Sequence, residues 1–352
     1  MRIGVVGGGI NGLCCAWELA RRGHAVRLFE RDRLMQATSQ ASSKLLHGGL
    51  RYIEKGEFRL VREALHERDA WLRRAPELAH PLRLVVPQYA GGRRGRLTIG
   101  LGLWIYDRLA GDSALPGHRH VCGSDLLRRV PGLRRDGLRG GYEFSDAQMD
   151  DYRLGLWVAE QARQAGVRIG EGEEVIRCDE DGGAHTAADA YRFDRILNVT
   201  GPWAEALLHR SGLTAPVRLD LVRGSHLILE RRCEQALLLE VPGEKRIFFV
   251  LPWQGHTLVG TTEVRQRLDE AISPSVEEER DLLRAYGHYF PTETPVVVGR
   301  FAGVRPLLAG AANPSDASRD SVIHRSGRLI TVFGGKWTTA MALARRVAGM
   351  VC

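Results

Sequence analysis

Hydrophobic positions recur with two different periods along the chain, and each period predicts a different kind of structure. Near the N-terminus a strand pattern, Ile3 to Val6, leads into a helical pattern that ends near Ala20, and a second strand pattern runs from Ala25 to Phe29. Between Val217 and Val264 apolar residues recur at every second position, which predicts an antiparallel sheet. The chain is therefore expected to be an α/β protein that combines a strand–helix–strand unit with antiparallel sheet.

Weaker patterns cover the rest of the chain. Helices are predicted over 57–72, 125–130, 153–165 and 277–289, and strands over 82–86, 167–169, 174–176, 191–199, 296–304 and 329–333. Pro76, Pro81 and Pro87 are expected to break the chain around the strand 82–86. The apolar segment 97–106 follows a basic loop and is expected to be a core helix, with a helix resting on a membrane surface as the alternative.

A glycine-rich motif joins the first strand to the first helix. Gly7, Gly9 and Gly12 form Gly-x-Gly-x-x-Gly, and Glu30 ends the second strand. In this context the glycines permit a tight turn, the helix N-terminus faces a pyrophosphate and the acidic residue bonds a ribose. The motif alone does not separate FAD from NAD. FAD is favoured because the chain continues with Thr38-Ser39 and the segment 42–52 instead of a further strand and helix.

The segment 42–52 gathers side chains that suit an anionic ligand. Lys44, His47 and Arg51 supply hydrogen-bond donors, and Gly48 and Gly49 let the backbone approach closely. A glycine turn leading into a basic helix is the alternative interpretation.

Charge limits the partners that the chain would take. The 352 residues have a formal net charge of +8, which favours anionic partners such as phosphorylated metabolites or acidic lipid. No basic stretch is interleaved with aromatic residues, so nucleic acid is not expected. Only four positions, 44, 55, 245 and 336, are Lys. Each Lys is therefore a more informative candidate for a binding or catalytic site.

The cysteines and the apolar runs indicate the cellular compartment in which the protein is expected. The six cysteines form no Cys-x-x-Cys pair, which argues against a zinc site or a disulfide framework and favours cytoplasmic chemistry with no metal. The chain begins directly on a strand pattern, so no signal peptide is expected. The longest apolar run, 97–106, is too short to span a bilayer, but peripheral contact with the inner face of the membrane is compatible with it.

Together the motifs resemble the FAD-dependent sn-glycerol-3-phosphate dehydrogenases, a family within the D-amino-acid-oxidase-like flavoproteins. The resemblance runs through eight segments: 7–12 with Glu30, 38–52, 198–203, 223–226, 248–253 with 260–262, 303–307, 318–320 and 334–339. It implies a Rossmann-like FAD-binding domain of the glutathione-reductase type (1–80, 145–215 and 320–352) interleaved with an antiparallel-sheet substrate domain (81–144 and 216–319). The family typically carries a further C-terminal helical domain, which this chain is expected to lack.

The resemblance also implies a role for individual residues. The ADP half of FAD would be held by Gly7, Gly9, Asn11, Gly12 and Glu30. The pyrophosphate and isoalloxazine would be lined by Thr38, Ser39, Ser43, Lys44, Leu45 and His47, and closed by Thr200, Gly201, Lys336 and Thr338. The substrate would be surrounded by Arg51, Tyr52, His226, Arg305, Arg319 and Lys336.

The implied reaction is hydride transfer from C2 of glycerol 3-phosphate to flavin N5, giving dihydroxyacetone phosphate, with electrons passed to a quinone or to another acceptor. His226 is the expected base because an ordinary imidazole titrates near neutrality. Arg305 or Lys336 would instead stabilise the alkoxide. An amine or 2-hydroxy-acid oxidase on the same fold is the alternative enzyme, and a flavin-binding regulatory or tRNA-modifying protein is the non-enzymatic alternative.

Overall fold

Two large β-sheets, a small third sheet and the helices that cover them make up the protein, which a computed structural model describes over residues 1–310 and 320–351. The smaller main sheet has six strands in the order β18 (Ser321–Ser326), β19 (Leu329–Gly334), β11 (Arg195–Asn198), β1 (Arg2–Val6), β2 (Ala25–Glu30) and β7 (Arg168–Glu171). From β19 to β7 neighbouring strands run parallel, whereas β18 pairs antiparallel with β19. Strand β1 lies inside this sheet, between β11 and β2. The glycine motif that follows β1 therefore lies among the carboxyl ends of the parallel strands.

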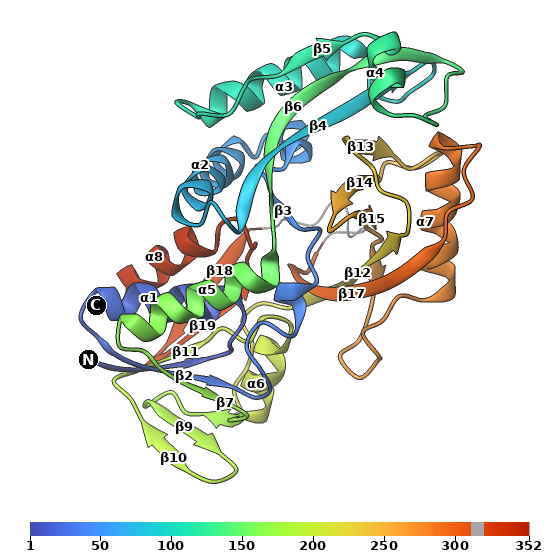
Figure 1. Cartoon of the computed structure of the whole chain (residues 1–352). Helices are drawn as coiled ribbons and strands as arrows, with labels where there is room; N and C mark the ends of the chain where they lie inside the picture. The colour runs from blue at the N-terminus through green and yellow to red at the C-terminus, as the bar shows by residue number, and fades with distance from the viewer. Residues whose placement is uncertain (311–319, 352) are drawn as a thin grey trace.

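Helices α1 (Ile10–Arg21), α5 (Asp151–Gln164) and α8 (Ala340–Val351) lie together over one face of this sheet (Figure 1). Leu13, Leu154 and Val347, one from each helix, are completely buried in the core that these helices share with β1. Helix α6 (Ala204–Arg210) and a small antiparallel sheet of β8 (Val175–Cys178), β9 (Gly183–Thr186) and β10 (Ala190–Arg192) cover part of the opposite face. The strand–helix–strand unit predicted from the N-terminal pattern is present as β1, α1 and β2, with β1 and β2 parallel neighbours.

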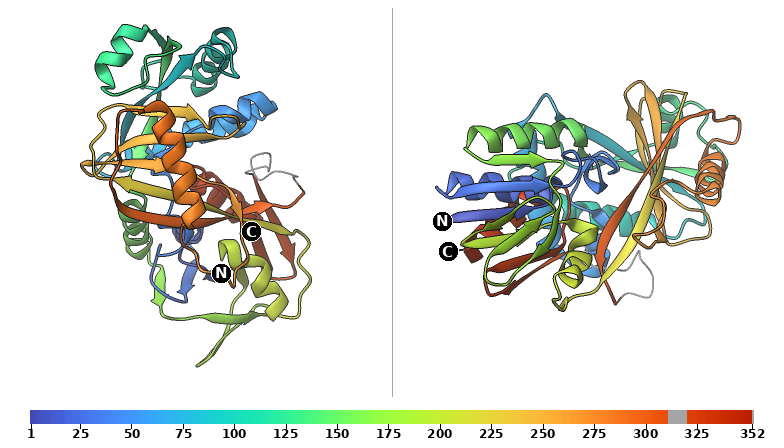
Figure 2. Two further views of the ribbon diagram at one scale, coloured as in Figure 1. Left: turned by 90° about the vertical axis from the view of Figure 1, so that its right-hand side faces the viewer. Right: turned by 90° about the horizontal axis from the view of Figure 1, so that it is seen from below.

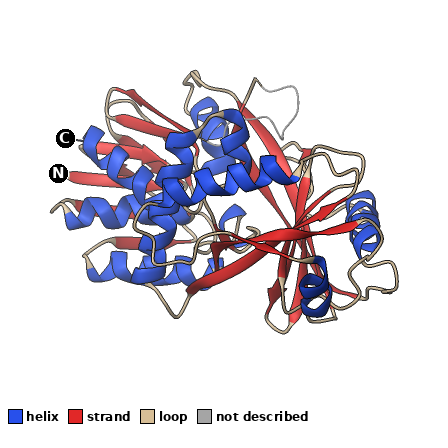
Figure 3. Ribbon diagram, turned by 90° about the horizontal axis from the view of Figure 1, so that it is seen from above, coloured by secondary structure: helices blue, strands red, loops and turns tan. Residues whose placement is uncertain are grey.

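The second sheet has ten strands and twists beside the first (Figures 2 and 3). Its order is β16 (Val264–Arg265), β12 (Leu219–Leu229), β15 (His256–Gly260), β14 (Ile247–Trp253), β13 (Ala236–Glu240), β4 (Ala79–Tyr89), β6 (Leu138–Met149) and β3 (Leu45–Leu46), with β17 (Val297–Leu308) on β12 and β5 (Arg119–Val121) on β6. Helices α4 (Gly123–Arg129) and α7 (Val276–Tyr289) pack on one face, and α2 (Phe58–Arg74) and α3 (Arg96–Ala110) on the other. The successive residues Leu84, Val85 and Val86 alternate between these two cores, as a strand buried on both faces requires.

The α/β fold class with a Rossmann-like sheet and an antiparallel sheet is confirmed, but two local predictions were wrong and one long strand was missed. The predicted strand 191–199 is two strands, β10 and β11, in different sheets. The chain does not break at Pro81 and Pro87, because β4 runs through both and pairs with β6 along its length. The long strand β6 was not predicted at all. Its buried Glu143, Asp146 and Gln148 hide the apolar alternation from a sequence pattern.

The assignment of residue ranges to two domains stays a prediction. Among the described residues no helix is long and apolar enough to cross a membrane, and no cluster of His, Cys, Asp or Glu could hold a metal ion.

Candidate active site

A long cavity of about 490 Å³ runs between the two sheets, from the glycine motif after β1 to the strands β14 and β17 of the larger sheet. Its volume lies in the range of cofactor and ligand pockets. The turns after β1 and β11, the segment 37–52 with its short 3-10 helices η1 (Thr38–Gln40) and η2 (Leu50–Lys55), and the β19–α8 junction all contribute to its walls. Segments far apart in sequence therefore meet along one channel.

The glycine end of the cavity is shaped by close backbone contacts. Gly7 has a φ of +112°, and a Cβ on it would lie 2.5 Å from the Val199 carbonyl oxygen. The carboxylate of Glu30 accepts a hydrogen bond from the Gly8 N–H at 2.7 Å, which holds the turn against β2. Asn11 carries a buried Oδ1 that has no hydrogen-bond partner among the described residues. This end is a narrow turn with an unused acceptor beside it.

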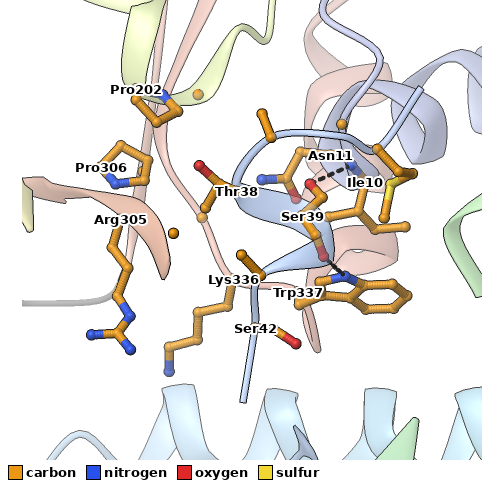
Figure 4. Close-up of a pocket in the computed structure, with 18 of the residues that line it drawn as sticks. Ile10, Asn11, Thr38, Ser39, Ser42, Pro202, Arg305, Pro306, Lys336 and Trp337 are labelled. Atoms are coloured by element: carbon orange, nitrogen blue, oxygen red, sulfur yellow. Dashed lines mark hydrogen bonds between the residues drawn. The ribbon is translucent and has the colours of Figure 1, made fainter. Parts of the chain in front are cut away.

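The N-terminus of α1 also faces the cavity. Its N-cap, Gly9, provides no capping side chain, and the first turn contains no acidic residue. The hydroxyl of Ser39 accepts from the Ile10 N–H at 3.0 Å, and Trp337 Nε1 donates to the Ser39 carbonyl at 3.1 Å (Figure 4). The positive end of the α1 dipole therefore faces the part of the cavity that Thr38 and Ser39 line. This arrangement suits a pyrophosphate.

Cationic side chains gather at the other end. Arg305 and Lys336 extend in the same direction, away from Asn11 (Figure 4). Arg305 Nη2 donates to Thr261 Oγ1 at 2.8 Å, and the Lys336 ammonium lies 3.9 Å from the centre of the Tyr52 ring. Arg51 lines the same cavity. Three cations converging on one pocket suit a ligand with several anionic oxygens.

Most residues that the sequence assigned to a site line this cavity. Those that do are Gly7, Gly9, Asn11, Glu30, Thr38, Ser39, Ser43, Leu45, His47, Arg51, Tyr52, Thr200, Gly201, Arg305, Lys336 and Thr338. Gly12, Lys44 and His226 are not among its described lining residues. Arg319 lies outside the described residues. The three exceptions each have a different physical reason.

Gly12 serves packing. A Cβ on it would lie 1.9 Å from the Gly7 carbonyl oxygen, so the absence of a side chain lets α1 pack directly on the turn after β1. Gly12 thus shapes the turn from behind and does not face the cavity.

Lys44 turns its ammonium away from the cavity. It forms a 2.7 Å ion pair with Asp151 at the start of α5 and donates to the Gln40 carbonyl at 2.6 Å. The residue has a φ of +60°, and Ser42 donates to the same Asp151 carboxylate. The sequence assigned the Lys44 ammonium to an anionic ligand, and in this structure a buried carboxylate is its partner instead.

His226 is buried behind the cavity wall. Its ring stacks on Phe301, with centroids 4.8 Å apart, and its Nε2 lies 2.9 Å from Ser43 Oγ. Burial, together with the positive charges of Arg305 and Lys44, holds the pKa of His226 well below its usual range. The reason for choosing His226 as the base, an ordinary imidazole pKa, therefore fails.

The sequence also missed a buried polar network next to His47. Gly48 N–H donates to Tyr106 Oη at 2.8 Å, Tyr106 donates to Asp146 at 2.7 Å, and Arg68 Nη1 donates to the same Asp146 oxygen at 3.2 Å. Burial raises the pKa of Asp146 to about 6, and Asp146 lines the cavity. Only the charged residues in the long strand β6 and in α2 could have signalled this network. It fixes the backbone immediately after His47.

The lining fits a dinucleotide. Glu30 lies at the end where a ribose would sit, the α1 N-terminus and the hydroxyls of Thr38 and Ser39 occupy the middle, and the cations lie at the far end. Next to Glu30, the Arg31 guanidinium carbon lies 4.1 Å from the centre of the Trp203 ring. The planar guanidinium and indole groups add a flat surface that suits an adenine.

Comparison with known proteins agrees with this geometry. Residues 2–350 match the DAO family, described as FAD dependent oxidoreductase. A D-erythritol 1-phosphate dehydrogenase of Brucella abortus is 38% identical over 97% of this chain and 72% of its own length. The aerobic glycerol-3-phosphate dehydrogenase of Escherichia coli is 35% identical over 97% and 71%, and a glycerol-3-phosphate dehydrogenase of Mycobacterium tuberculosis is 34% identical over 97% and 61%. The chain thus spans between 61% and 72% of the length of these relatives.

Solved structures show the same fold. The glycerol-3-phosphate dehydrogenase of Bacillus halodurans, complexed with FAD, has a TM-score of 0.78 at 24% identity and covers 100% of this chain and 64% of its own. The L-alpha-glycerophosphate oxidase of Mycoplasma pneumoniae, with FAD bound, has a TM-score of 0.80 at 19% identity, covering 99% and 94%.

Proposed function

Because the chain belongs to the FAD dependent oxidoreductase family and uses FAD as its cofactor, we propose that it oxidises sn-glycerol 3-phosphate to dihydroxyacetone phosphate. The observation that carries the proposal is the convergence of Arg51, Arg305 and Lys336 at one end of the FAD cavity. A phosphate dianion matches several cations, whereas a carboxylate or an amine needs fewer.

The residues that line the cavity are proposed to hold the cofactor in order along its length. Glu30 would bond the ribose, the α1 N-terminus with Thr38 and Ser39 would take the pyrophosphate, and the β19–α8 junction with Thr338 would border the ring. When bound there, FAD supplies the acceptor for the hydride that leaves substrate C2. Positive charge from Lys336 beside the ring would favour the negative charge that follows reduction.

The substrate phosphate is proposed to lie between Arg51 and Arg305. The hydrogen bond from Arg305 to Thr261 holds the guanidinium in one orientation, so little side-chain entropy remains to be lost on binding. The Arg51 guanidinium lies 3.9 Å from Glu263, whose side chain is 6% exposed, and this carboxylate would orient Arg51 and accept from a substrate hydroxyl. Lys336 then lies near the carbon that is oxidised.

We assign the base to His47 rather than to His226. The His47 imidazole lines the cavity, and its ring meets the Phe249 ring edge-on at 6.4 Å. Its backbone is fixed on both sides, since its own N–H donates to Thr338 Oγ1 at 3.3 Å and the next N–H bonds Tyr106. A side chain that takes a proton from the 2-hydroxyl must reach the substrate, and this requirement favours His47, which lines the cavity, over His226, which does not.

Reduction of the protein-bound flavin without oxygen tests the proposed substrate. We expect sn-glycerol 3-phosphate to bleach the flavin absorbance, and glycerol, glycine and lactate at equal concentration to leave it oxidised. Bleaching by an amine or a 2-hydroxy acid alone would overturn the proposal. A faster reaction with a four-carbon polyol phosphate, the substrate class named for the Brucella relative, would replace glycerol 3-phosphate by that class.

The same experiment on two arginines of β17 supplies a matched control. Arg305→Ala should slow reduction by the phosphate ester roughly a hundredfold, because a bond to a charged group is lost. Arg300→Ala removes an exposed guanidinium that pairs with Glu279 outside the cavity, and its rate should not change.

We also propose that α3 rests on an anionic bilayer and that a quinone held there accepts the electrons. Leu97, Leu101 and Trp104 follow helical spacing and are 87%, 60% and 49% exposed. Arg108 covers the Trp104 ring at 5.1 Å, and the preceding loop is basic. An exposed apolar face bordered by arginines suits the headgroup region of acidic lipid.

Leu101→Asp should weaken sedimentation of the holoenzyme with phosphatidylglycerol vesicles about tenfold, because it removes apolar area and adds repulsion. It should slow reoxidation of the reduced enzyme by vesicle-borne quinone without changing reduction by substrate. Leu156→Asp, at an exposed leucine of α5 on the other sheet, is the control. Equal sedimentation of the two variants with the wild-type protein would refute docking through α3.

A further inference from the structure

The contact between His226 and Ser43 joins a buried imidazole to the cavity wall. His226 is 1% exposed, and its Nε2 lies 2.9 Å from the hydroxyl of Ser43, which lines the cavity. We propose that His226 is a positioning residue that holds the Ser43 hydroxyl as a hydrogen-bond donor to an acceptor atom of the isoalloxazine. This inference rests on FAD binding and on no particular substrate.

The imidazole has one orientation because strands on both sides enclose it. His226 of β12 lies opposite Gly260 of β15 and Phe301 of β17. A Cβ on Gly260 would lie 2.2 Å from His226 Cδ2, so the ring occupies the space of the missing side chain. On its other face the ring stacks on Phe301 at an angle of 14°. A ring held in this way places Nε2 at a fixed point for Ser43.

The hydrogen-bond inventory then sets the direction of the His226–Ser43 bond. His226 Nδ1 is buried and has no hydrogen-bond partner among the described residues. If Nδ1 carried the proton, a buried N–H would be left without an acceptor, which proteins tolerate less often than an unpaired acceptor. The favoured tautomer therefore has its proton on Nε2 and donates to Ser43 Oγ. Ser43 in turn keeps its own proton for a partner in the cavity.

The surroundings keep this imidazole neutral, so it does not act as a competing cation. Arg305 and Lys44 are the charged groups that oppose its protonation, and burial acts in the same direction. Ser43 belongs to the same segment, 42–52, as His47 and Arg51, and all three residues line the cavity. A donor at this position would stabilise the electron density that the flavin ring gains on reduction.

The midpoint potential of the bound FAD, measured spectroscopically without substrate, tests the inference in four variants. Ser43→Ala and His226→Leu should each make reduction of the flavin about tenfold less favourable, which is a shift of ~30 mV to lower potential for two electrons. The double variant should shift no further than either single one, because both remove the same hydrogen bond. His226→Gln should stay near the wild-type potential, since its amide can donate from the position of Nε2.

Two results would overturn the inference. Additive shifts in the double variant would mean that His226 acts on the flavin by another route, and an unchanged potential in Ser43→Ala would mean that the hydroxyl does not donate to the ring. If the buried leucine of His226→Leu prevents folding, His226→Met, which likewise has no donor at the position of Nε2, takes its place in the single and double variants. Because no substrate is used, failure here is distinct from failure of the proposed substrate.

Discussion

Replacing His47 by Asn is expected to lower the rate of flavin reduction by glycerol 3-phosphate by about 10²–10⁴-fold, the usual contribution of a positioned base. Asn keeps a polar amide near the position of the imidazole Nδ1 but cannot take the proton of the 2-hydroxyl. The protein should still bind FAD, because the backbone N–H of residue 47 that donates to Thr338 is unaffected by the substitution. Single-turnover mixing without oxygen, followed at the flavin absorbance, measures this step directly.

Two further histidines make this measurement selective. His66→Asn, at an exposed position of α2 outside the FAD cavity, should reduce at the wild-type rate. His226→Gln should retain most of the rate, because it preserves the bond to Ser43. If His226→Gln lost as much rate as His47→Asn, or if His47→Asn kept its rate, the base would not be His47.

The two histidines also show what the sequence could and could not predict about the site. Motif order selected both residues, and the structure places His47 in the cavity lining and His226 behind it, in contact with Ser43. The choice between them depended on burial and on neighbouring charge, which arise only when β12, β15 and β17 enclose His226. A residue type and its ordinary pKa therefore predict a candidate base, but only packing shows which imidazole faces the ligand.

Lys44 illustrates the same limit for charges. A rare lysine within a hydroxyl-rich segment was a reasonable candidate for an anionic ligand. Its ammonium instead pairs with Asp151, 107 residues away in sequence. Burial raises the pKa of Asp151, and the Lys44 ammonium opposes that rise. Long-range ion pairs of this kind follow no sequence period, so a single sequence does not reveal them.

The regular parts of the fold were predictable for a physical reason. The strand–helix–strand unit around Gly7 and the antiparallel strands after Val217 bury continuous or alternating apolar residues, which leave a periodic signal. Strand β6 was missed because buried charges interrupt its pattern and are satisfied by distant arginines, such as Arg83 on Glu143. Buried polar residues near the site thus interrupt the apolar pattern of the strand that carries them, and a sequence pattern then fails to predict that strand.

Replacing Gly12 by Ala is expected to give a protein that is isolated largely without FAD. The new Cβ would lie 1.9 Å from the Gly7 carbonyl oxygen, and neither atom can move without a shift of the backbone that carries it. Helix α1 would have to move from the turn, although it is packed between the sheet and the helices α5 and α8. Overpacking of this kind costs about 1–3 kcal/mol of stability, and the displaced turn would no longer direct the α1 N-terminus at the pyrophosphate.

The ratio of flavin to protein absorbance and the free energy of unfolding in urea measure both consequences of Gly12→Ala. Gly287→Ala in α7 is the matched control, because its Cβ would meet no atom within 4 Å. That substitution should leave FAD content unchanged and stabilise the helix by about 0.5–1 kcal/mol. A Gly12→Ala protein with full FAD content and wild-type stability would show that α1 can retreat from the turn. The close contact would then not be what aligns the helix with the cofactor.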